Sequence, residues 1–327
     1  MAYYSTFLSP FFAANIIIQQ YIEQGRHFLF ITQSRREIVK VNYLFLLATT
    51  TAISCNVAAK NTPVNATNPV ADQVVAEQRA KLADNTKEKG FGPQSPRNID
   101  TVQGNNSMLF SAAPAYNDMN LCNIHFHKNA EHMGGEFSQY AGNGDGKGHG
   151  SGYRYSGSLT QAELTPVAGE ICPSKNGSLN AGDTIEVHYV YSTAQITPGA
   201  TLGACFNDAI KNPQLRVEAQ VYVLVNDSTA LDFGKLTGFG EQDGRYQALN
   251  LPANTGKSVH YAGSTTGPVY NEKGSPFQVS WGVRPQVAKV NIATVGEWCK
   301  GNVFEEDHAH GVRNLVTNPD LLSEITQ

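Results

Sequence analysis

Two short segments contain the residues whose types and spacing best suit metal chemistry. In the first, His125 and His127 stand two residues apart, so on a strand both rings project from one face, together with Asn123. In the second, Glu186 and His188 share a face for the same reason. Adjacent imidazoles favour a metal ion such as zinc, which takes one nitrogen from each ring. The spacing therefore predicts a metal site on paired strands.

A third histidine would complete this site. If the two segments pair as antiparallel strands, His188 joins His125 and His127, and three histidines with one open position are typical of catalytic zinc. Glu186 can accept the second ring N–H of His188 and fix its orientation. His132 is the other candidate, because it lies close to His127 in the sequence. We favour His188, since a strand is a rigid element that positions a ligand well.

Two glycine-containing segments are predicted to form loops. Residues 261–268 place Thr265 and Thr266 between glycines, which suits either contact with a ligand or an ordinary turn. Residues 134–157 are rich in glycine and are expected to form a long surface loop with a short hairpin at most. A loop of this length is often functional, but glycine by itself identifies no function.

The elements that must carry these residues are strands. The chain has 327 residues, 30 glycines, 15 prolines and only 16% charged residues, which excludes a coiled coil and a disordered polyelectrolyte. Its net charge of −4 gives no general basic surface, so nucleic acid is not an expected partner. The expected partner is a small-molecule substrate. The strand-like runs are Leu121–His127, Thr184–Tyr191, Leu215–Val225, Phe277–Val283 and Val287–Thr294.

The sequence divides into three parts. Residues 1–55 are predicted to be a signal or targeting segment, because basic residues precede an apolar run that is too short to span a bilayer comfortably. This run ends at Cys55, which resembles the lipidated cysteine of a bacterial lipoprotein. Residues 56–90 lack aromatic side chains and are predicted to be a flexible linker, and residues 91–327 to be one catalytic domain. We expect a secreted or periplasmic protein, with a membrane contact only through a lipid anchor.

Four cysteines remain after Cys55, and an even number in a secreted chain predicts two disulfides. Cys122 opens the first histidine strand, and Cys172 lies in the loop before the second. We therefore expect Cys122 to pair with Cys172, which leaves Cys205 for Cys299. Four cysteines allow three pairings, so this connectivity is a hypothesis.

In their order along the chain, these segments resemble the carbonic anhydrases, most closely the delta class, whose layout is similar to that of the alpha class. The resemblance covers residues 91–316. It implies a fold that is mainly β (α+β), a single domain around a large twisted, mostly antiparallel sheet. The motifs that carry it are Gln94-Ser-Pro-Arg-Asn-Ile99, His125-Phe-His127, Ala130-Glu-His132, Glu186-Val-His188, Gly263-Ser-Thr-Thr266 and Gly311-Val-Arg313.

The resemblance implies an activity and its metal ligands. The reaction would be the reversible hydration of carbon dioxide to bicarbonate and a proton, by attack of zinc-bound hydroxide. His125, His127 and His188 match the zinc ligands. Asn123 and Glu186 match the residues that orient the first and the third ligand.

The resemblance also implies roles for residues around the metal. Either Thr265 or Thr266 would accept a hydrogen bond from the hydroxide, with Glu131 holding that threonine, and His132 would be structural. The alpha enzymes usually carry a proton-shuttling histidine before the first ligand, but residues 91–124 contain no histidine. The histidines that could replace it are His149, His260 and His310, and none is assigned. The residues implied to line the apolar substrate pocket are Val190, Val221, Val223 and Trp281.

Two other functions fit part of the pattern. A cupin-type metal enzyme would use His125, His127 and Glu131 as ligands, but the second cupin motif is missing near His188. A secreted binding module with a structural metal would need a fourth protein ligand. The residues that surround the metal therefore separate the three interpretations.

Overall fold

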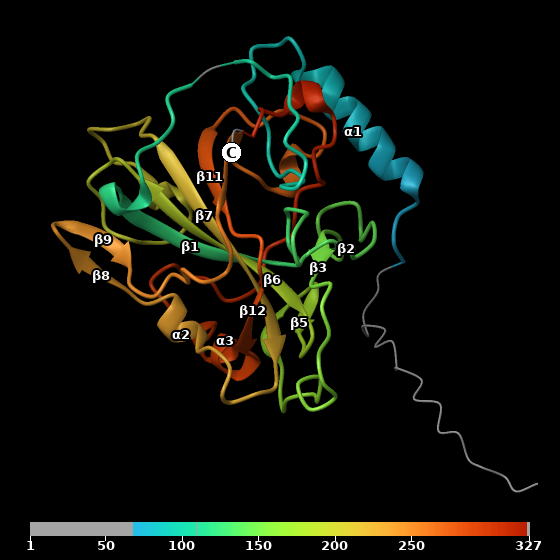
Figure 1. Cartoon of the computed structure of the whole chain (residues 1–327), viewed down its shortest axis with the longest axis vertical. Helices are drawn as coiled ribbons and strands as arrows, with labels where there is room; N and C mark the ends of the chain where they lie inside the picture. The colour runs from blue at the N-terminus through green and yellow to red at the C-terminus, as the bar shows by residue number, and fades with distance from the viewer. Residues whose placement is uncertain (1–67, 109, 326–327) are drawn as a thin grey trace, which may run out of the picture. The chain divides into compact units, whose positions relative to one another are not determined.

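The computed structural model describes residues 68–108 and 110–325 (Figure 1). The predicted signal segment and Cys55 lie outside the described residues. So does the first part of the predicted linker.

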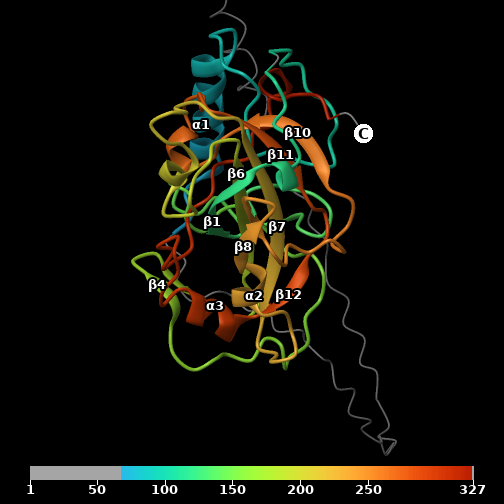
Figure 2. The same ribbon diagram turned by 90° about the vertical axis from the view of Figure 1, so that its left-hand side faces the viewer.

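The described chain is organised around one six-stranded sheet (Figures 1 and 2). Its strands follow the order β1-β6-β7-β11-β10, and β12 pairs with a further part of β7. The β7–β11 and β7–β12 pairs are parallel and the others are antiparallel, so the prediction of a mainly β, mostly antiparallel fold is confirmed. The strands are β1 (Asn120–Lys128), β6 (Thr184–Ser192), β7 (Leu215–Val225), β10 (Val259–Ser264), β11 (Gln278–Val283) and β12 (Ala288–Asn291).

Strand β6 lies at the centre of the part of the sheet that carries the histidines. Valine, isoleucine, threonine and tyrosine favour extended backbone, and all nine residues of β6 are buried. Its antiparallel pairing with β1 places His125 directly opposite His188. The pairing that the histidine spacing required is therefore present.

Two apolar clusters fill the two faces of this sheet. The first contains Val187 and Tyr189 of β6 and includes the short helices α2 (Phe233–Leu236) and α3 (Ile292–Trp298), which lie together at one end of the molecule (Figure 2). The second contains Val190 of β6, on the face that carries the histidines. Both faces of the central strands are thus covered, which explains why β6 has no exposed residue.

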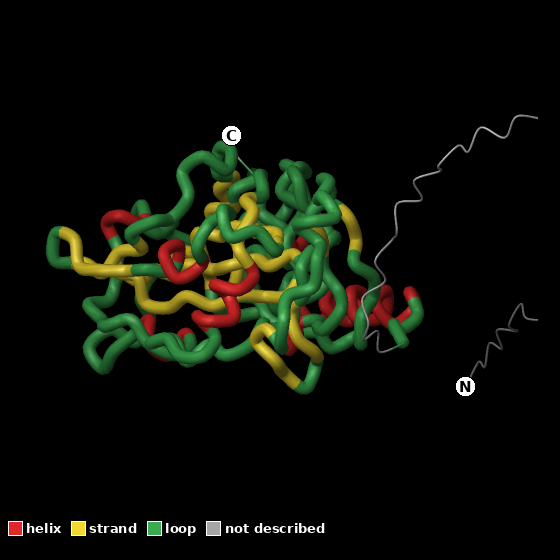
Figure 3. The backbone as a smooth tube through the Cα atoms, turned by 90° about the horizontal axis from the view of Figure 1, so that it is seen from below, coloured by secondary structure: helices red, strands yellow, loops and turns green. Residues whose placement is uncertain are grey.

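Most of the remaining chain consists of turns and loops (Figure 3). The small strands form three hairpins, β2–β3, β4–β5 and β8–β9. None of the described helices is long and apolar enough to cross a membrane. The other short elements are η1 (Tyr116–Asp118), β2 (Gln139–Tyr140), β3 (Tyr153–Arg154), β4 (Ile171–Ser174), β5 (Gly177–Leu179), η2 (Leu202–Cys205), β8 (Phe239–Gln242), β9 (Arg245–Ala248), η3 (Pro268–Tyr270) and η4 (Pro319–Leu321).

The segment predicted to be a linker differs from that expectation. Its last part forms helix α1 (Asp72–Thr86), which packs on the domain through the buried side chains of Val75 and Leu82. The guanidinium of Arg79 donates to the carbonyl of Leu315 at 3.2 Å. Val75 and Leu82 are seven positions apart and therefore lie on one face of the helix. Two apolar residues in a mostly polar segment are a weak pattern, which is why the sequence did not predict a packed helix here.

The prediction of two disulfides is confirmed, but the predicted pairing is wrong. Cys122 is bonded to Cys205, and Cys172 to Cys299. Cys122 and Cys205 belong to the cluster on the histidine face of the sheet, whereas Cys172 and Cys299 belong to the cluster on the opposite face. The sheet itself therefore separates the cysteines that the sequence analysis paired.

The glycine-rich loop is packed against the rest of the domain. It includes the β2–β3 hairpin, and the carbonyl of Gly148 accepts a hydrogen bond from the backbone of Val312 at 2.9 Å. Gly148 has a φ of 103°, and a Cβ added there would lie 2.8 Å from the carbonyl oxygen of Val312. Glycine is required here because both the backbone conformation and this close approach exclude a side chain.

Candidate metal centre

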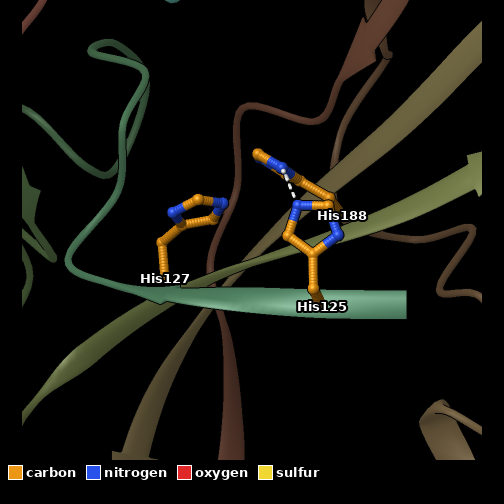
Figure 4. Close-up of side chains that lie close together, drawn as sticks. All are labelled: His125, His127 and His188. Atoms are coloured by element: carbon orange, nitrogen blue, oxygen red, sulfur yellow. Dashed lines mark hydrogen bonds between the residues drawn. The ribbon is translucent and has the colours of Figure 1, made fainter. Parts of the chain in front are cut away.

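Three histidines from β1 and β6 point toward one another (Figure 4). His125 and His127 project from one face of β1, and His188 projects beside them from β6. Each offers one ring nitrogen to a group whose atoms lie within 4.8 Å of one another. His127 and His188 are almost fully buried. This arrangement is a buried three-histidine metal site.

The outer nitrogen of the first histidine is held by an amide. Nδ1 of His125 donates to Oδ1 of Asn123 at 2.7 Å. The amide nitrogen of Asn123 donates in turn to the carbonyl of Gly199 at 3.0 Å, which fixes the amide orientation. Nδ1 of His125 therefore carries the proton, and Nε2 presents its lone pair to the site.

The other two rings are oriented by oxygen atoms in the same way. Nδ1 of His127 donates to the carbonyl of Gly311 at 3.0 Å. Nε2 of His188 donates to Oε1 of Glu186 at 2.9 Å. Neither acceptor carries a proton, so the inward atoms, Nε2 of His127 and Nδ1 of His188, are lone-pair nitrogens in the neutral rings.

These three lone pairs fit a metal cation. Nδ1 of His188 lies 3.2 Å from Nε2 of His125, and Nε2 of His127 is buried with no hydrogen-bond partner among the described residues. Burial lowers the pKa of His127 to about 4, and burial together with the neighbouring histidines lowers that of His125. The rings of His125 and His127 are therefore neutral at physiological pH. A cation would satisfy Nε2 of His127, which no group of the described chain satisfies, and could be shared by the two other inner nitrogens, which otherwise contact only each other.

Glu186 connects the metal site to the protein behind it. Its Oε1 accepts from Nδ1 of His132 at 2.6 Å as well as from His188, and its Oε2 accepts the backbone N–H groups of Glu131 and His132 at 2.7 and 3.1 Å. Burial acts to raise the pKa of Glu186, but the bonds to His132 and His188 outweigh it and hold the pKa well below its usual value. Glu186 is thus a buried carboxylate whose two oxygens are both hydrogen-bonded.

His132 uses both ring nitrogens within this network. Nδ1 contacts Glu186, and Nε2 lies 2.7 Å from the hydroxyl of Tyr261. That hydroxyl is also 3.0 Å from Oγ of Ser95. His132 therefore has no nitrogen free for a ligand at the three-histidine site. The sequence analysis did not assign a role to Tyr261 or Ser95, and no local pattern distinguishes them.

Glu131 and the threonines are arranged differently from the expectation. Oε1 of Glu131 accepts the backbone N–H of Arg313 at 2.8 Å, and Oε2 is buried without a partner among the described residues. The hydroxyl of Thr265 lies 2.6 Å from that of Ser275, and no described hydrogen bond joins Glu131 to Thr265 or Thr266. The expected contact between the carboxylate and a threonine is therefore not formed here.

The geometry gives no support to the cupin interpretation. Oε1 of Glu131 lies 3.8 Å from Nδ1 of His127, but this is the outer nitrogen of the ring, which donates to the carbonyl of Gly311. Among the described residues, two groups could hold a metal, and Glu131 belongs to neither. These groups are His125, His127 and His188, and His132, Glu186 and His188. A ligand set of two histidines and this glutamate is not assembled.

A cavity of about 520 Å³ opens onto the three histidines. Of the four residues implied to line a substrate pocket, Val190 and Trp281 line this cavity, whereas Val221 and Val223 are buried elsewhere and do not. The register of β6 and β7 gives the reason, since it places Val217 beside Val190 and Val221 beside Glu186. The other apolar side chains of the cavity wall are Leu202, Leu215, Val217 and Val279.

Further histidines lie around this cavity. His149, from the glycine-rich loop, and His310 line it, whereas the third shuttle candidate, His260, pairs with Gly282 in the β10–β11 ladder and does not. Nε2 of His310 is 2.7 Å from Oε2 of Glu306, and this hydrogen bond raises the pKa of His310. His308, which the sequence analysis did not single out, also lines the cavity.

Several carbonic anhydrase structures are similar to this chain. One is the alpha-carbonic anhydrase from Thermovibrio ammonificans in complex with the inhibitor sulfanilamide, with 18% identity over 68% of this chain and 84% of that chain and a TM-score of 0.25. Another is the alpha-carbonic anhydrase of Photobacterium profundum, with 18% identity, 70% and 88% coverage and a TM-score of 0.24. A hyperthermostable carbonic anhydrase from a hydrothermal vent chimney has 15% identity, 71% and 87% coverage and a TM-score of 0.25.

The sequence match is more direct. No curated protein matches the chain. A sequence model of the family described as delta carbonic anhydrase, however, matches residues 116–294, which is more than half of the chain and contains all three histidines of the site. The chain belongs to the delta carbonic anhydrase family.

Proposed function

We propose that this protein catalyses the zinc-dependent, reversible hydration of carbon dioxide to bicarbonate and a proton. One observation carries the proposal. Three histidines, each oriented by an oxygen acceptor on its outer nitrogen, present their inner nitrogens to a cavity that is partly apolar. Family membership supports the same reaction.

The donor set favours zinc as the metal. Three imidazoles with an open fourth position are typical of catalytic zinc, which acts there as a Lewis acid and acidifies a coordinated water. The ligand atoms would be Nε2 of His125, Nε2 of His127 and Nδ1 of His188. No neighbouring carboxylate belongs to this group, so the ion would keep its full charge.

The side chains around the cavity would perform complementary tasks. Val190 and Trp281 form an apolar wall that suits an uncharged substrate. Thr265 and Thr266 supply hydroxyl groups on another part of the wall. We propose that one of these threonines orients the attacking oxygen, and that Glu131 stabilises this part of the site through the backbone N–H of Arg313.

The test is a comparison of carbon dioxide hydration before and after removal of the metal. The purified protein should hydrate carbon dioxide when it holds about one zinc per chain. The activity should disappear after chelation and return when zinc is added. If the zinc-loaded, folded protein has no hydration activity, the proposed reaction is wrong. If activity survives complete removal of metal, the proposed role of the three histidines is wrong.

We also propose that the protein acts outside the cytoplasm, as a secreted or periplasmic enzyme. The two disulfides support this location, because disulfides persist mainly in oxidising compartments. Fractionation of cells into culture medium, periplasm and cytoplasm tests it. Recovery of the protein in the cytoplasmic fraction would contradict the proposal. Lipidation of Cys55 stays a prediction from the sequence.

A further inference from the structure

We propose that Ser275 positions the hydroxyl of Thr265 in the metal cavity. This inference rests on the proposed function at one point: the hydroxyl of Thr265 is taken to contact the groups that react during carbon dioxide hydration. Thr265 belongs to the wall of the cavity, whereas Ser275 lies behind it and is not part of the lining. Ser275 would therefore act through Thr265 and not on the substrate.

The contact between the two hydroxyls is short and protected from solvent. Oγ1 of Thr265 lies 2.6 Å from Oγ of Ser275. Ser275 has no exposed surface and Thr265 is 8% exposed. Whichever hydroxyl donates, this bond fixes the rotation of Oγ1 about the Cα–Cβ bond of Thr265. Few water molecules can compete for it, because both groups are buried.

Ser275 is itself held by a second side chain. The side-chain amide of Gln94 makes two hydrogen bonds with the backbone of Ser275. It accepts from the N–H at 2.7 Å and donates to the carbonyl at 3.1 Å. Gln94 is fully buried, and its Oε1 also lies 3.3 Å from the guanidinium of Arg313. The hydroxyl of Ser275 therefore extends from a fixed piece of backbone.

The backbone of Thr265 is fixed independently of its side chain. Its N–H donates to the carbonyl of Phe277 at 2.9 Å, and the indole N–H of Trp281 donates to the carbonyl of Ser264 at 3.0 Å. These bonds hold the main chain but leave the threonine side chain free to rotate. Among the described residues, Ser275 is the only hydrogen-bond partner of that hydroxyl. The position of Ser275 therefore determines where in the cavity the remaining lone pair or proton of Thr265 points.

This assignment differs from the one that the sequence suggested. Glu131 was expected to hold the threonine, but its Oε1 is used by Arg313 and its Oε2 has no partner among the described residues. Ser275 makes the contact with Thr265 that was expected of that carboxylate. A neutral hydroxyl differs from a carboxylate because it can either donate or accept. Which of the two hydroxyls, Ser275 or Thr265, donates the hydrogen bond is therefore set by the groups that Thr265 meets in the cavity.

The first experiment removes the Ser275 hydroxyl. Ser275→Ala should lower kcat/KM for carbon dioxide hydration about tenfold, the effect of one well-placed hydrogen bond. The metal content and Tm should stay close to those of the matched control Ser323→Ala, which removes another buried serine hydroxyl, bonded to the carbonyl of Ala262 and outside the cavity. If Ser275→Ala fails to fold while Ser323→Ala folds, Ser275 is structural and the proposal is overturned.

The second experiment tests whether Ser275 acts through Thr265. Thr265→Val removes the hydroxyl and keeps the shape of the side chain. If the proposal is right, the double variant Ser275→Ala/Thr265→Val should have the kcat/KM of Thr265→Val alone. Losses that multiply in the double variant would overturn it. So would a Thr265→Val variant with wild-type activity.

The third measurement does not depend on turnover. The Co²⁺-loaded protein should show a visible absorption spectrum that changes with pH. Ser275→Ala and Thr265→Val should both move the midpoint of this change, and the double variant should have the midpoint of Thr265→Val alone. Shifts that add in the double variant would overturn the proposal. This measurement tests the link between Ser275 and Thr265 separately from the proposed hydration activity, because it can detect that link even in a protein that does not hydrate carbon dioxide.

Discussion

The two faces of β6 are both buried but are stabilised in different ways. One face carries Glu186 and His188, and His188 lines the metal cavity. Each polar atom of these two side chains that does not point to the cation position is hydrogen-bonded. The other face presents Val187 and Tyr189 to an apolar cluster. The first face depends on hydrogen bonds with fixed geometry, and the second depends mainly on the area removed from water.

This difference predicts how each face responds to substitution. A buried polar group that loses its partner is costly and loses its orientation, so changes on the metal face should affect metal binding first. A truncated apolar side chain leaves a cavity, so changes on the opposite face should affect the free energy of unfolding first. The two faces can therefore be separated by measuring both quantities in the same variants.

The largest effect is expected for His188→Ala on the metal face. Removal of this ligand should abolish metal binding at micromolar zinc and lower the hydration rate by more than about 100-fold, the upper limit for residues that only orient a ligand. His132→Ala should retain the metal and lose stability, because both of its ring nitrogens are used inside the protein. Metal analysis of both purified, folded variants decides between them. The opposite pattern would show that the ligands come from one local segment.

On the apolar face, Phe126→Ala should act on stability instead. Phe126 is fully buried, and its ring contacts those of Phe233 and Trp298. Its truncation should lower the free energy of unfolding by about 3–5 kcal/mol in urea. The folded fraction should still bind one metal ion per chain. Loss of metal from correctly folded Phe126→Ala would show that the two faces are not independent.

A smaller effect is expected for Glu186→Gln. The amide can no longer accept on both oxygens from His132, His188 and the backbone, so the orientation of His188 should loosen. Zinc affinity should fall by about 10- to 100-fold in a competition assay with a chelator. Glu163→Gln is the matched control, because it removes a carboxylate paired with Lys289, outside the metal cavity. Equal affinities of the two variants would refute this role of Glu186.

The smallest effect concerns a titratable group on the face away from the histidines. Burial raises the pKa of Glu218 to about 7, although Arg216 partly opposes this. A carboxyl whose pKa is higher in the folded state stabilises the protein while protonated, and this contribution is lost as pH rises from the unfolded value toward 7. Between pH 6 and 8 the free energy of unfolding should fall by roughly 1 kcal/mol through Glu218, and Glu218→Gln should remove this fall. Urea unfolding of both proteins at pH 6 and at pH 8 measures the difference. An unchanged pH dependence would contradict the raised pKa.

The sequence alone predicted the features that depend on local alternation. The run Leu121–His127 corresponds to β1, and Leu215–Val225 coincides with β7. Two-residue spacing placed His125 and His127 on one face, because side chains alternate along a strand whatever it pairs with. The order of the motifs also indicated the family, which the sequence match shows.

Local patterns failed where an element is short or irregular. The strand β10 was missed, since it contains His260 and Gly263 and shows no clean alternation. The run predicted as a strand at 287–294 ends in helix α3, which begins at Ile292 after the capping side chain of Asn291. Isoleucine and valine favour strands, but the cap and the packing of α3 on the apolar cluster override that preference.

Only the tertiary structure decided which distant groups meet. Cys122 pairs with Cys205 because both lie on the histidine face, and Val217, not Val221, reaches the cavity because of the β6–β7 register. The hydroxyl contact between Thr265 and Ser275 likewise joins two loop residues, and their spacing in the sequence does not predict that contact. Alternation is a property of a few adjacent residues, whereas register, the covered face of a sheet and the packing of loops depend on the whole chain.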